Sequence, residues 1–143
     1  MLTKFDEQSQ KAIVIAESLA FDFGHTNVGS EHLLLSLLKI QESKLKKLLE
    51  KYHVDDEVIE EDIKRLFGQN DEQPFYLEYS EKIKQILERS MDISKKKNQS
   101  QVTLNVLTIA LLQVKESDAI ELLKKYNFDI VITEKEGAYS IKF

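Results

Sequence analysis

Two histidines and a glutamate lie close together in the chain, at His25, Glu31 and His32, with the hydroxyl of Ser30 between them. Imidazole nitrogens and carboxylates bind metals and transfer protons, so this stretch is where chemistry would first be sought. Nothing in the spacing directs three ligands toward one point, and no trio of acid, histidine and nucleophile can be argued from it. We therefore expect no metal and no catalytic residue, and a histidine that hydrogen-bonds the local backbone. A small metal-dependent hydrolase using His25, Glu31 and His32 is the remote alternative.

Glu31 has two interpretations that the sequence leaves open. The carboxylate is expected in the first turn of a helix capped by Ser30, where the helix dipole favours negative charge. The side chain also points out of the turn, where it could pair with a guanidinium group.

The sequence lacks the motifs of common cofactor and nucleotide sites. It contains no GxxxxGK[ST] loop, no GxGxxG and no HExxH. It contains no cysteine, which excludes disulfides, a thiolate nucleophile and a Cys-based zinc site. We therefore expect no cofactor, and a protein that is not an enzyme.

Helices must position these residues, since one proline and four glycines give the chain few breaks. Apolar residues recur at helical spacing after a series of polar capping residues. Gly24 and Gly68 are expected to end helices. The expected caps are Asp6, Ser30, Ser43, Asp55, Ser80, Thr103 and Ser117.

The chain repeats itself. Residues 24–38 have a degraded copy at 98–112, and residues 5–55 overlay on 79–129 without a gap, with about a quarter of positions identical. We predict a mostly all-α fold, a tandem pseudo-two-fold repeat of a four-helix unit within one domain, 1–143. Repeat one spans 5–68, a polar linker spans 69–78 and repeat two spans 79–129.

The repeat fails at its end, where the second copy lacks a fourth helix. Residues 130–143 alternate between apolar and polar, are rich in β-branched and aromatic residues, and contain Glu136-Gly137 as a turn. We predict a β-hairpin that packs on repeat two. A short helix over Ile130 to Glu136, and a hairpin edge that pairs with a partner, are the alternatives.

Composition excludes several partners. A net charge of -5 does not suit binding to phosphate backbones. No apolar stretch approaches the roughly 20 residues that span a bilayer. We expect neither nucleic acid nor membrane as a partner, and a cytoplasmic location, which the absence of cysteine fits.

Several motifs together resemble the Clp amino-terminal (Clp-N) repeat domain of ClpA- and ClpC-type AAA+ unfoldases, with the ClpC type most similar. The resemblance covers residues 3 to about 129. It is carried by Phe5 to Ala12, by Gly24-His25-x-Asn27-x-Gly29-Ser30-Glu31-His32-Leu33-Leu34-Leu35, by Leu66-Phe67-Gly68, by Tyr79-Ser80-x-Lys82 and by Ser90-Met91-Asp92.

The resemblance implies a non-catalytic double helical module that recruits adaptor proteins and substrate polypeptides of a Clp protease for unfolding. In ClpC-type members it also implies one phosphoarginine pocket in each repeat. There a glutamate takes the guanidinium, while a hydroxyl and a basic residue from the start of the repeat's first helix hold the phosphate.

Neither implied pocket is complete in this sequence. Repeat one keeps Glu31 but has Asp6 and Gln8 at the phosphate positions. A carboxylate beside a phosphate is repulsive. We therefore expect repeat one to hold the guanidinium half of a pocket alone.

Repeat two keeps Ser80 and Lys82 but has Asn105 in place of the glutamate, which removes the charge-assisted pair. Each repeat is thus predicted to hold half a pocket, with phosphoarginine recognition weak or lost. We expect an isolated domain to be a monomer. A stand-alone adaptor or regulator without ATPase modules is the alternative context.

Overall fold

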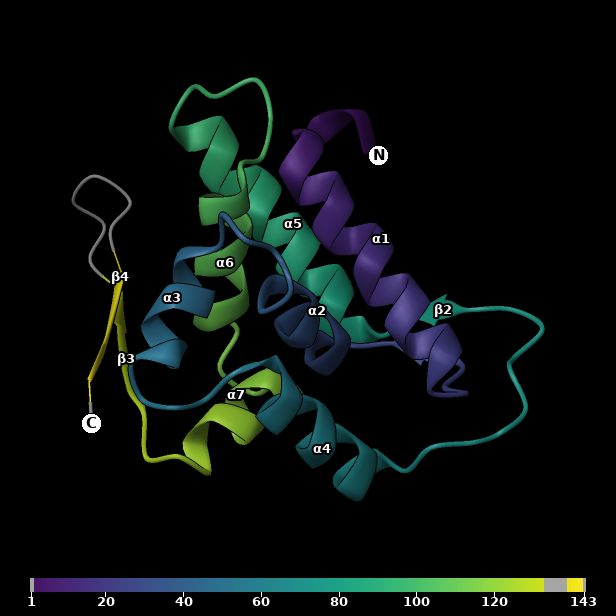
Figure 1. Ribbon diagram of the computed structural model, residues 1–143. Coiled ribbons are helices and arrows are strands. Elements are labelled where there is room, and N and C mark those ends of the chain that lie inside the picture. The colour runs from purple at the N-terminus through teal and green to yellow at the C-terminus, as the bar shows by residue number, and fades with distance from the viewer. Residues whose placement is uncertain (1, 133–138, 143) are drawn as a thin grey trace.

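The computed structural model describes residues 2–132 and 139–142, which form seven α-helices, four short strands and one 3-10 turn (Figure 1). The first half of the chain contains η1 (Leu2–Lys4), α1 (Glu7–Asp22), β1 (Asn27–Val28), α2 (Ser30–Leu37), α3 (Lys44–Glu50) and α4 (Asp56–Phe67). The second half contains β2 (Glu78–Tyr79), α5 (Glu81–Lys96), α6 (Leu104–Gln113), α7 (Asp118–Lys124), β3 (Asp129–Ile132) and β4 (Tyr139–Lys142). The predicted mostly helical fold is confirmed.

Six of the seven predicted caps are confirmed. In each, the side chain accepts a hydrogen bond from the backbone N–H three residues later, which satisfies a donor that the first turn leaves open. The capping residues are Asp6, Ser43, Asp55, Ser80, Thr103 and Ser117. The prediction for Ser30 is wrong, since the N-cap of α2 is Gly29.

The repeat extends to backbone detail. Helices α1, α2 and α3 begin 74 positions before α5, α6 and α7. The positive φ angle of Gly24 (74°) has its counterpart in Asn98 (57°), and that of His53 (64°) in Asn127 (59°). Asparagine is one of the few residues other than glycine that adopts this conformation, so the copy keeps the turn without the glycine.

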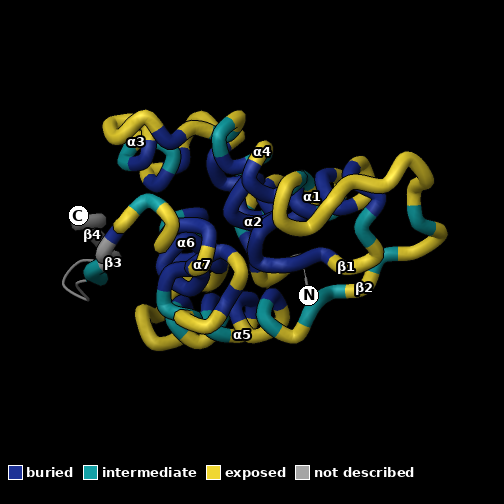
Figure 2. Tube along the Cα trace, turned by 90° about the horizontal axis from the view of Figure 1, so that it is seen from below, coloured by how far each residue is buried: buried dark blue, intermediate teal, exposed yellow. Residues whose placement is uncertain are grey.

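Helix α2 lies at the centre of the molecule, with all eight of its residues buried (Figure 2). It contacts α1, α4, α5, α6 and α7. Its counterpart α6 is buried almost as completely and packs on α5 and α1. Because both central helices are buried almost all round, each repeat closes its core only by packing on the other.

Two backbone exchanges that the sequence did not predict join the repeats. Val28 pairs in parallel with Tyr79, and Val102 pairs in parallel with Phe5. The two pairings are equivalent, because Val102 lies 74 positions after Val28 and Tyr79 lies 74 positions after Phe5. The exchange places the start of each repeat's first helix beside the other repeat's turn.

A buried carboxylate adds a third link between the repeats. Asp62 of α4 is 3% exposed and accepts hydrogen bonds from Lys125 Nζ at 2.6 Å and from the hydroxyl of Tyr126, both next to α7. Arg65 Nη2 also donates to it at 2.8 Å. Burial alone would raise the pKa of Asp62, but these donors outweigh burial and lower it.

The predicted C-terminal strands are confirmed, since β3 and β4 pair antiparallel with Ile132 opposite Tyr139. The predicted turn at Glu136-Gly137 lies outside the described residues. Strand β3 lies against α6, and Ile132 packs on the core. This supports the prediction that the strands cover the face left open by the missing eighth helix.

Candidate functional site

The first corner, residues 24–31, carries the chain from α1 to α2. Gly24 ends the turn after α1 with a positive φ of 74°, and a Cβ atom there would lie 2.5 Å from the backbone oxygen of Asn70. The Asn70 N–H donates to the carbonyl of Phe23 at 2.9 Å, and its side-chain amide donates to that of Gly24 at 3.2 Å. The linker is therefore anchored on this corner, which excludes any side chain at position 24.

A directional chain of hydrogen bonds runs through the two histidines. The Gly29 N–H donates to Nδ1 of His32 at 2.9 Å, so Nδ1 is unprotonated and Nε2 carries the hydrogen. This Nε2 lies 2.9 Å from Nδ1 of His25, and His25 Nε2 lies 2.8 Å from the carbonyl oxygen of Gly68. A consistent assignment makes each Nε2 the donor, which leaves both imidazoles neutral.

This arrangement confirms the expectation of a histidine that hydrogen-bonds the corner backbone. Burial, followed by the neighbouring His25, lowers the pKa of His32 to about 3. The Nδ1 lone pairs of His25 and His32 both accept hydrogen bonds, so neither points to a shared metal position. Among the described residues no group of three potential ligands converges. The geometry therefore gives the hydrolase alternative no support.

Glu31 is the unusual residue of the corner. It is 7% exposed, and its Oε1 accepts no hydrogen bond from any described residue. The carboxylate folds back over Gly29, where a Cβ atom would lie 1.9 Å from Oε1. Burial raises the pKa of Glu31 to about 7, its own backbone N–H lowers it, and Asp118 adds a smaller increase.

Glu31 is one of the residues that line a cavity of about 320 Å³, which opens at the first corner. His25, Asn27, Phe67 and Asn70 contribute further walls. A buried acceptor without a partner is energetically unfavourable, and a cationic donor entering the cavity would supply the missing interaction. The arrangement can therefore bind a guanidinium or ammonium group.

Ser30 has a structural role that the sequence did not reveal. Its Oγ accepts a hydrogen bond from the backbone N–H of Ala119 at 3.0 Å and so joins α2 to α7. The capping function passes to Gly29 and His32, whose ring replaces the glutamate of a usual capping box. The Gly29-x-x-His32 spacing was the only sign of this capping arrangement in the sequence. Capping boxes usually have glutamate or glutamine at the position of His32, so the spacing was not recognised.

The predicted phosphate-side residues lie beside the first corner. Ser80 caps α5, where its Oγ accepts the Ile83 N–H at 3.2 Å, and its own N–H donates to the carbonyl of Val28 at 3.0 Å. Lys82, half-buried, follows in the first turn of α5. Ser80 and Glu31 thus flank the same Val28-Gly29 segment from opposite repeats.

Asn105 lies at the second corner, residues 98–105, in the first turn of α6. There Val102 accepts a hydrogen bond from the N–H of Asp6 at 2.9 Å. Gln8, in the first turn of α1 next to this pairing, has a buried Oε1 that accepts no hydrogen bond from a described residue. The second corner therefore combines an asparagine, a glutamine and a carboxylate.

Backbone contacts show which corner adjoins each of the predicted pocket residues. Ser80 begins α5, whereas Ser94 near the end of α5 donates to the carbonyl of Gln101 at 3.0 Å, next to the second corner. Most of a 16-residue helix, roughly 24 Å long, therefore separates Ser80 from Asn105. The backbone exchanges place Ser80 beside Val28 of the first corner, and Asp6 beside Val102 of the second corner.

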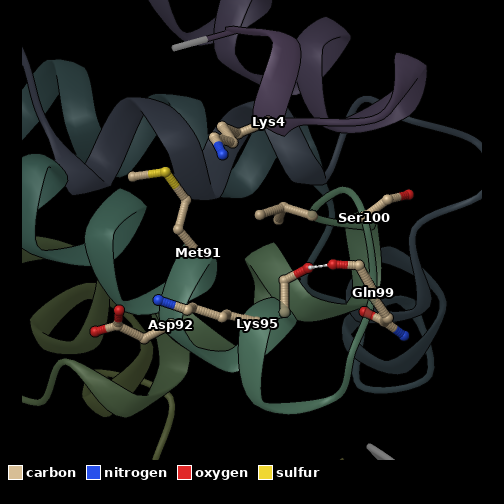
Figure 3. Close-up of a pocket in the computed structure, with 8 residues that line it drawn as sticks. Lys4, Met91, Asp92, Lys95, Gln99 and Ser100 are labelled. Atoms are coloured by element: carbon tan, nitrogen blue, oxygen red, sulfur yellow. Dashed lines mark hydrogen bonds between the residues drawn. The ribbon is translucent and has the colours of Figure 1, made fainter.

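A separate cavity of about 370 Å³ lies near the second corner. Lys4 lies across it from Asp92 and Lys95, and Met91 supplies an apolar wall (Figure 3). Ser94 and Gln99 also line it, and Ser94 Oγ donates to the carbonyl of Gln99 at 3.3 Å. Both lysines are exposed, and none of the described residues that line this cavity has a buried acceptor without a hydrogen bond.

Comparison with known proteins finds similarity over most of the chain. A model of the family described as Clp repeat (R) N-terminal domain matches residues 4–128. The ATP-dependent Clp protease ATP-binding subunit ClpC of Staphylococcus saprophyticus is 30% identical over 131 residues, which is 92% of this chain and 16% of that protein. The negative regulator of genetic competence ClpC/MecB of Bacillus subtilis is 30% identical over 123 residues, 86% of this chain and 15% of that protein.

Solved structures share the fold at lower identity. The N-terminal domain of ClpD from Arabidopsis thaliana matches with a TM-score of 0.70 and 18% identity, covering 89% of this chain and 88% of that one. The ClpV N-domain in complex with a VipB peptide matches with a TM-score of 0.68 and 21% identity, covering 88% and 79%. The chain spans about a sixth of the length of the curated relatives it matches.

Proposed function

This chain belongs to the Clp repeat N-terminal domain family, and we propose that it recruits adaptor proteins and substrate polypeptides to a Clp-type unfoldase. It is a protein-interaction domain in which the recruitment surface, not a catalytic centre, carries the function. We propose that it does so in the cytoplasm, as a monomer when isolated. In the described residues no helix is both long enough and apolar enough to cross a bilayer.

One observation carries this proposal, the buried carboxylate of Glu31 with its unpartnered Oε1 at a cavity of about 320 Å³. A fold does not need an unsatisfied buried acceptor, and such groups are rare in native structures. A peptide side chain with N–H donors and positive charge would satisfy it. Burial also means that Glu31 must lose its proton when the cation enters, and this cost weakens binding near neutral pH.

We infer that phosphoarginine recognition is weak at the first corner and lost at the second. The first corner has a carboxylate for the guanidinium, and Ser80 and Lys82 for the phosphate, but Glu31 is half protonated near pH 7. The second corner has Asn105 in place of an acidic partner, and Asp6 repels phosphate. The two corners therefore differ in kind, although their backbones match.

Isothermal titration of the chain with free phosphoarginine tests this assignment. We expect one weak site, with a Kd above about 10 μM, and binding that is lost in Glu31→Gln and unchanged in the matched variant Asn105→Ala. A Kd in the low micromolar range would contradict weak recognition. Two equivalent sites, or binding that survives Glu31→Gln, would contradict the grouping.

A further inference from the structure

The linker displays two aromatic side chains to solvent. Phe75 is fully exposed and Tyr76 is 63% exposed, although both follow a segment that is anchored to the protein. Most of the linker between α4 and β2 is exposed (Figure 2). Asn70 binds the backbone of the first corner at one end of the linker, and β2 pairs with β1 at the other. We call residues 71–77 the aromatic loop. Exposed aromatics on an anchored loop are typical of interaction surfaces.

An acidic cleft adjoins the aromatic loop. This cleft, which we call the first cleft, has a volume of about 470 Å³. It is lined by Glu17, Ser18, Phe21 and Asp22 of α1 and by Leu77 of the loop. The Tyr79 hydroxyl donates to the Glu17 carboxylate at 3.0 Å, which fixes one wall.

The acidic character extends over this end of the molecule. The chain has no lysine or arginine between positions 12 and 38 or between 66 and 81. Asp71, Glu72 and Glu78 add further negative charge along the linker. Lys64 of α4 lies over the Phe23 ring at 5.9 Å and pairs with Glu60 at 3.3 Å.

The duplicated backbone provides an internal comparison. The cavity shown in Figure 3 is the counterpart of the first cleft, and we call it the second cleft. Glu17 is replaced there by Met91, and Phe21 by Lys95, while Lys4 occupies the position equivalent to Glu78. The first cleft thus carries two carboxylates, Glu17 and Asp22, whereas the second carries two lysines and a single carboxylate, Asp92. The fold does not require the acidic set, so its presence beside the exposed aromatics needs another explanation.

We propose that the first cleft and the aromatic loop together bind an extended polypeptide segment that presents basic side chains next to apolar ones. The cationic heads interact with Glu17 and Asp22, while the aliphatic stems lie along Phe21. The neighbouring apolar side chains pack on Phe75 and Tyr76. The charge of the surface excludes acidic segments by repulsion, and this gives the interaction its specificity.

This surface is distinct from the Glu31 cavity, so the proposal goes beyond the proposed function. Glu31 does not line the first cleft, and none of the cleft residues Glu17, Phe21 and Asp22 lines the Glu31 cavity. A ligand of the first cleft should therefore bind equally well to Glu31→Gln.

Nuclear magnetic resonance titration of the 15N-labelled chain tests the proposal. The probe is a disordered 12-residue peptide of alternating arginine and leucine, and the control peptide has glutamate in place of arginine. We expect saturable shift changes over residues 17–22 and 70–79 with the arginine peptide only. Binding should weaken several-fold when the salt concentration rises from 50 to about 500 mM, because exposed charges are then screened.

Variants separate the contributions. Phe75→Ser should weaken binding about tenfold without changing the melting temperature, because the ring is fully exposed in the folded chain. The double variant Glu17→Lys, Asp22→Lys should lose the arginine peptide and gain the glutamate peptide. Lys95→Ser at the second cleft is the matched control, and it should bind the arginine peptide as the wild type does.

Other outcomes would overturn the proposal. Shift changes confined to the Glu31 cavity, equal binding of both peptides, or unchanged binding by Phe75→Ser would each contradict it. Sedimentation equilibrium that showed a dimer dissociated by Phe75→Ser would assign the surface to a second copy of this chain instead.

Discussion

Replacing Glu31 by glutamine should stabilise the protein above pH 7 and have little effect below pH 4.5. The buried carboxyl has its pKa raised from 4.5 to about 7. Between these values the native state holds a proton that the unfolded state has released. The contribution of the protonated Glu31 carboxyl to the free energy of unfolding is therefore fully present below pH 4.5, and it is lost as the pH rises through 7. Glutamine has a similar volume and cannot ionise.

The magnitude follows from the two pKa values. At 1.36 kcal/mol per pH unit, the native state of the wild type should lose about 3 kcal/mol between pH 4.5 and 8. Relaxation around the charge makes this an upper estimate. With roughly 2–4 °C per kcal/mol for a domain of this size, the melting temperature of Glu31→Gln should exceed that of the wild type by up to roughly 10 °C at pH 8.

The difference between variant and wild type is the informative quantity, because His32 has the opposite dependence. The pKa of His32 is lowered from 6.5 to about 3, first by burial and then by His25. Its contribution to stability is present above pH 6.5 and is lost as pH falls toward 3. In the wild type the two slopes oppose each other between pH 4.5 and 6.5, and subtraction of the two curves isolates Glu31.

Thermal unfolding followed by circular dichroism from pH 4 to 9 measures this difference. Glu81→Gln is the matched control, since Glu81 lies in the first turn of α5 with its side chain 83% exposed. We expect its curve to parallel that of the wild type. Parallel curves for Glu31→Gln, or a lower melting temperature at pH 8, would refute the account of the buried carboxyl.

Three further predictions concern the framework. Gly24→Ala should destabilise the chain more than Gly68→Ala, because both glycines have a positive φ but only the Cβ at 24 meets backbone, within 2.5 Å; the difference in unfolding free energy should exceed about 1 kcal/mol in urea titrations. His32→Ala should cost about 1–3 kcal/mol by the same measurement, because it leaves the buried Gly29 N–H unsatisfied. Deleting residues 130–143 should lower the melting temperature by several degrees, because β3 packs on α6, and an unchanged melting curve would favour a docking role for these strands.

Local features of this fold could be predicted from the sequence because their causes are local. A cap such as Ser43 or Thr103 bonds a backbone N–H three residues away, and the residue types involved are few. Ser30 has the right residue type, but its hydroxyl binds the Ala119 N–H, 89 positions away. No local pattern distinguishes that role from a cap.

The sequence identified the residues of the candidate site, but it did not show which residues of the two repeats lie next to each other. Glu31 stands out in the sequence because packing and chain geometry do not require it. Its association with Ser80 depends on the Ser80 N–H binding the carbonyl of Val28, a backbone contact between repeats that leaves no trace in residue types. Assigning each residue to its own repeat was therefore the natural assumption, and the association of Glu31 with Ser80 across the repeats is our proposal in its place.

The exchange also separates what the fold requires from what it leaves variable. Val28 and Val102 are identical and occupy equivalent pairings, and their neighbours keep the same backbone hydrogen bonds in both halves. The side chains near these pairings have diverged, with Asn105 at the position equivalent to Glu31 and Lys95 at the position equivalent to Phe21. If these side chains served stability, the same backbone would favour the same residues twice. Their divergence is better explained by two halves that meet different parts of a bound polypeptide, and a peptide that binds both clefts with equal affinity would contradict this explanation.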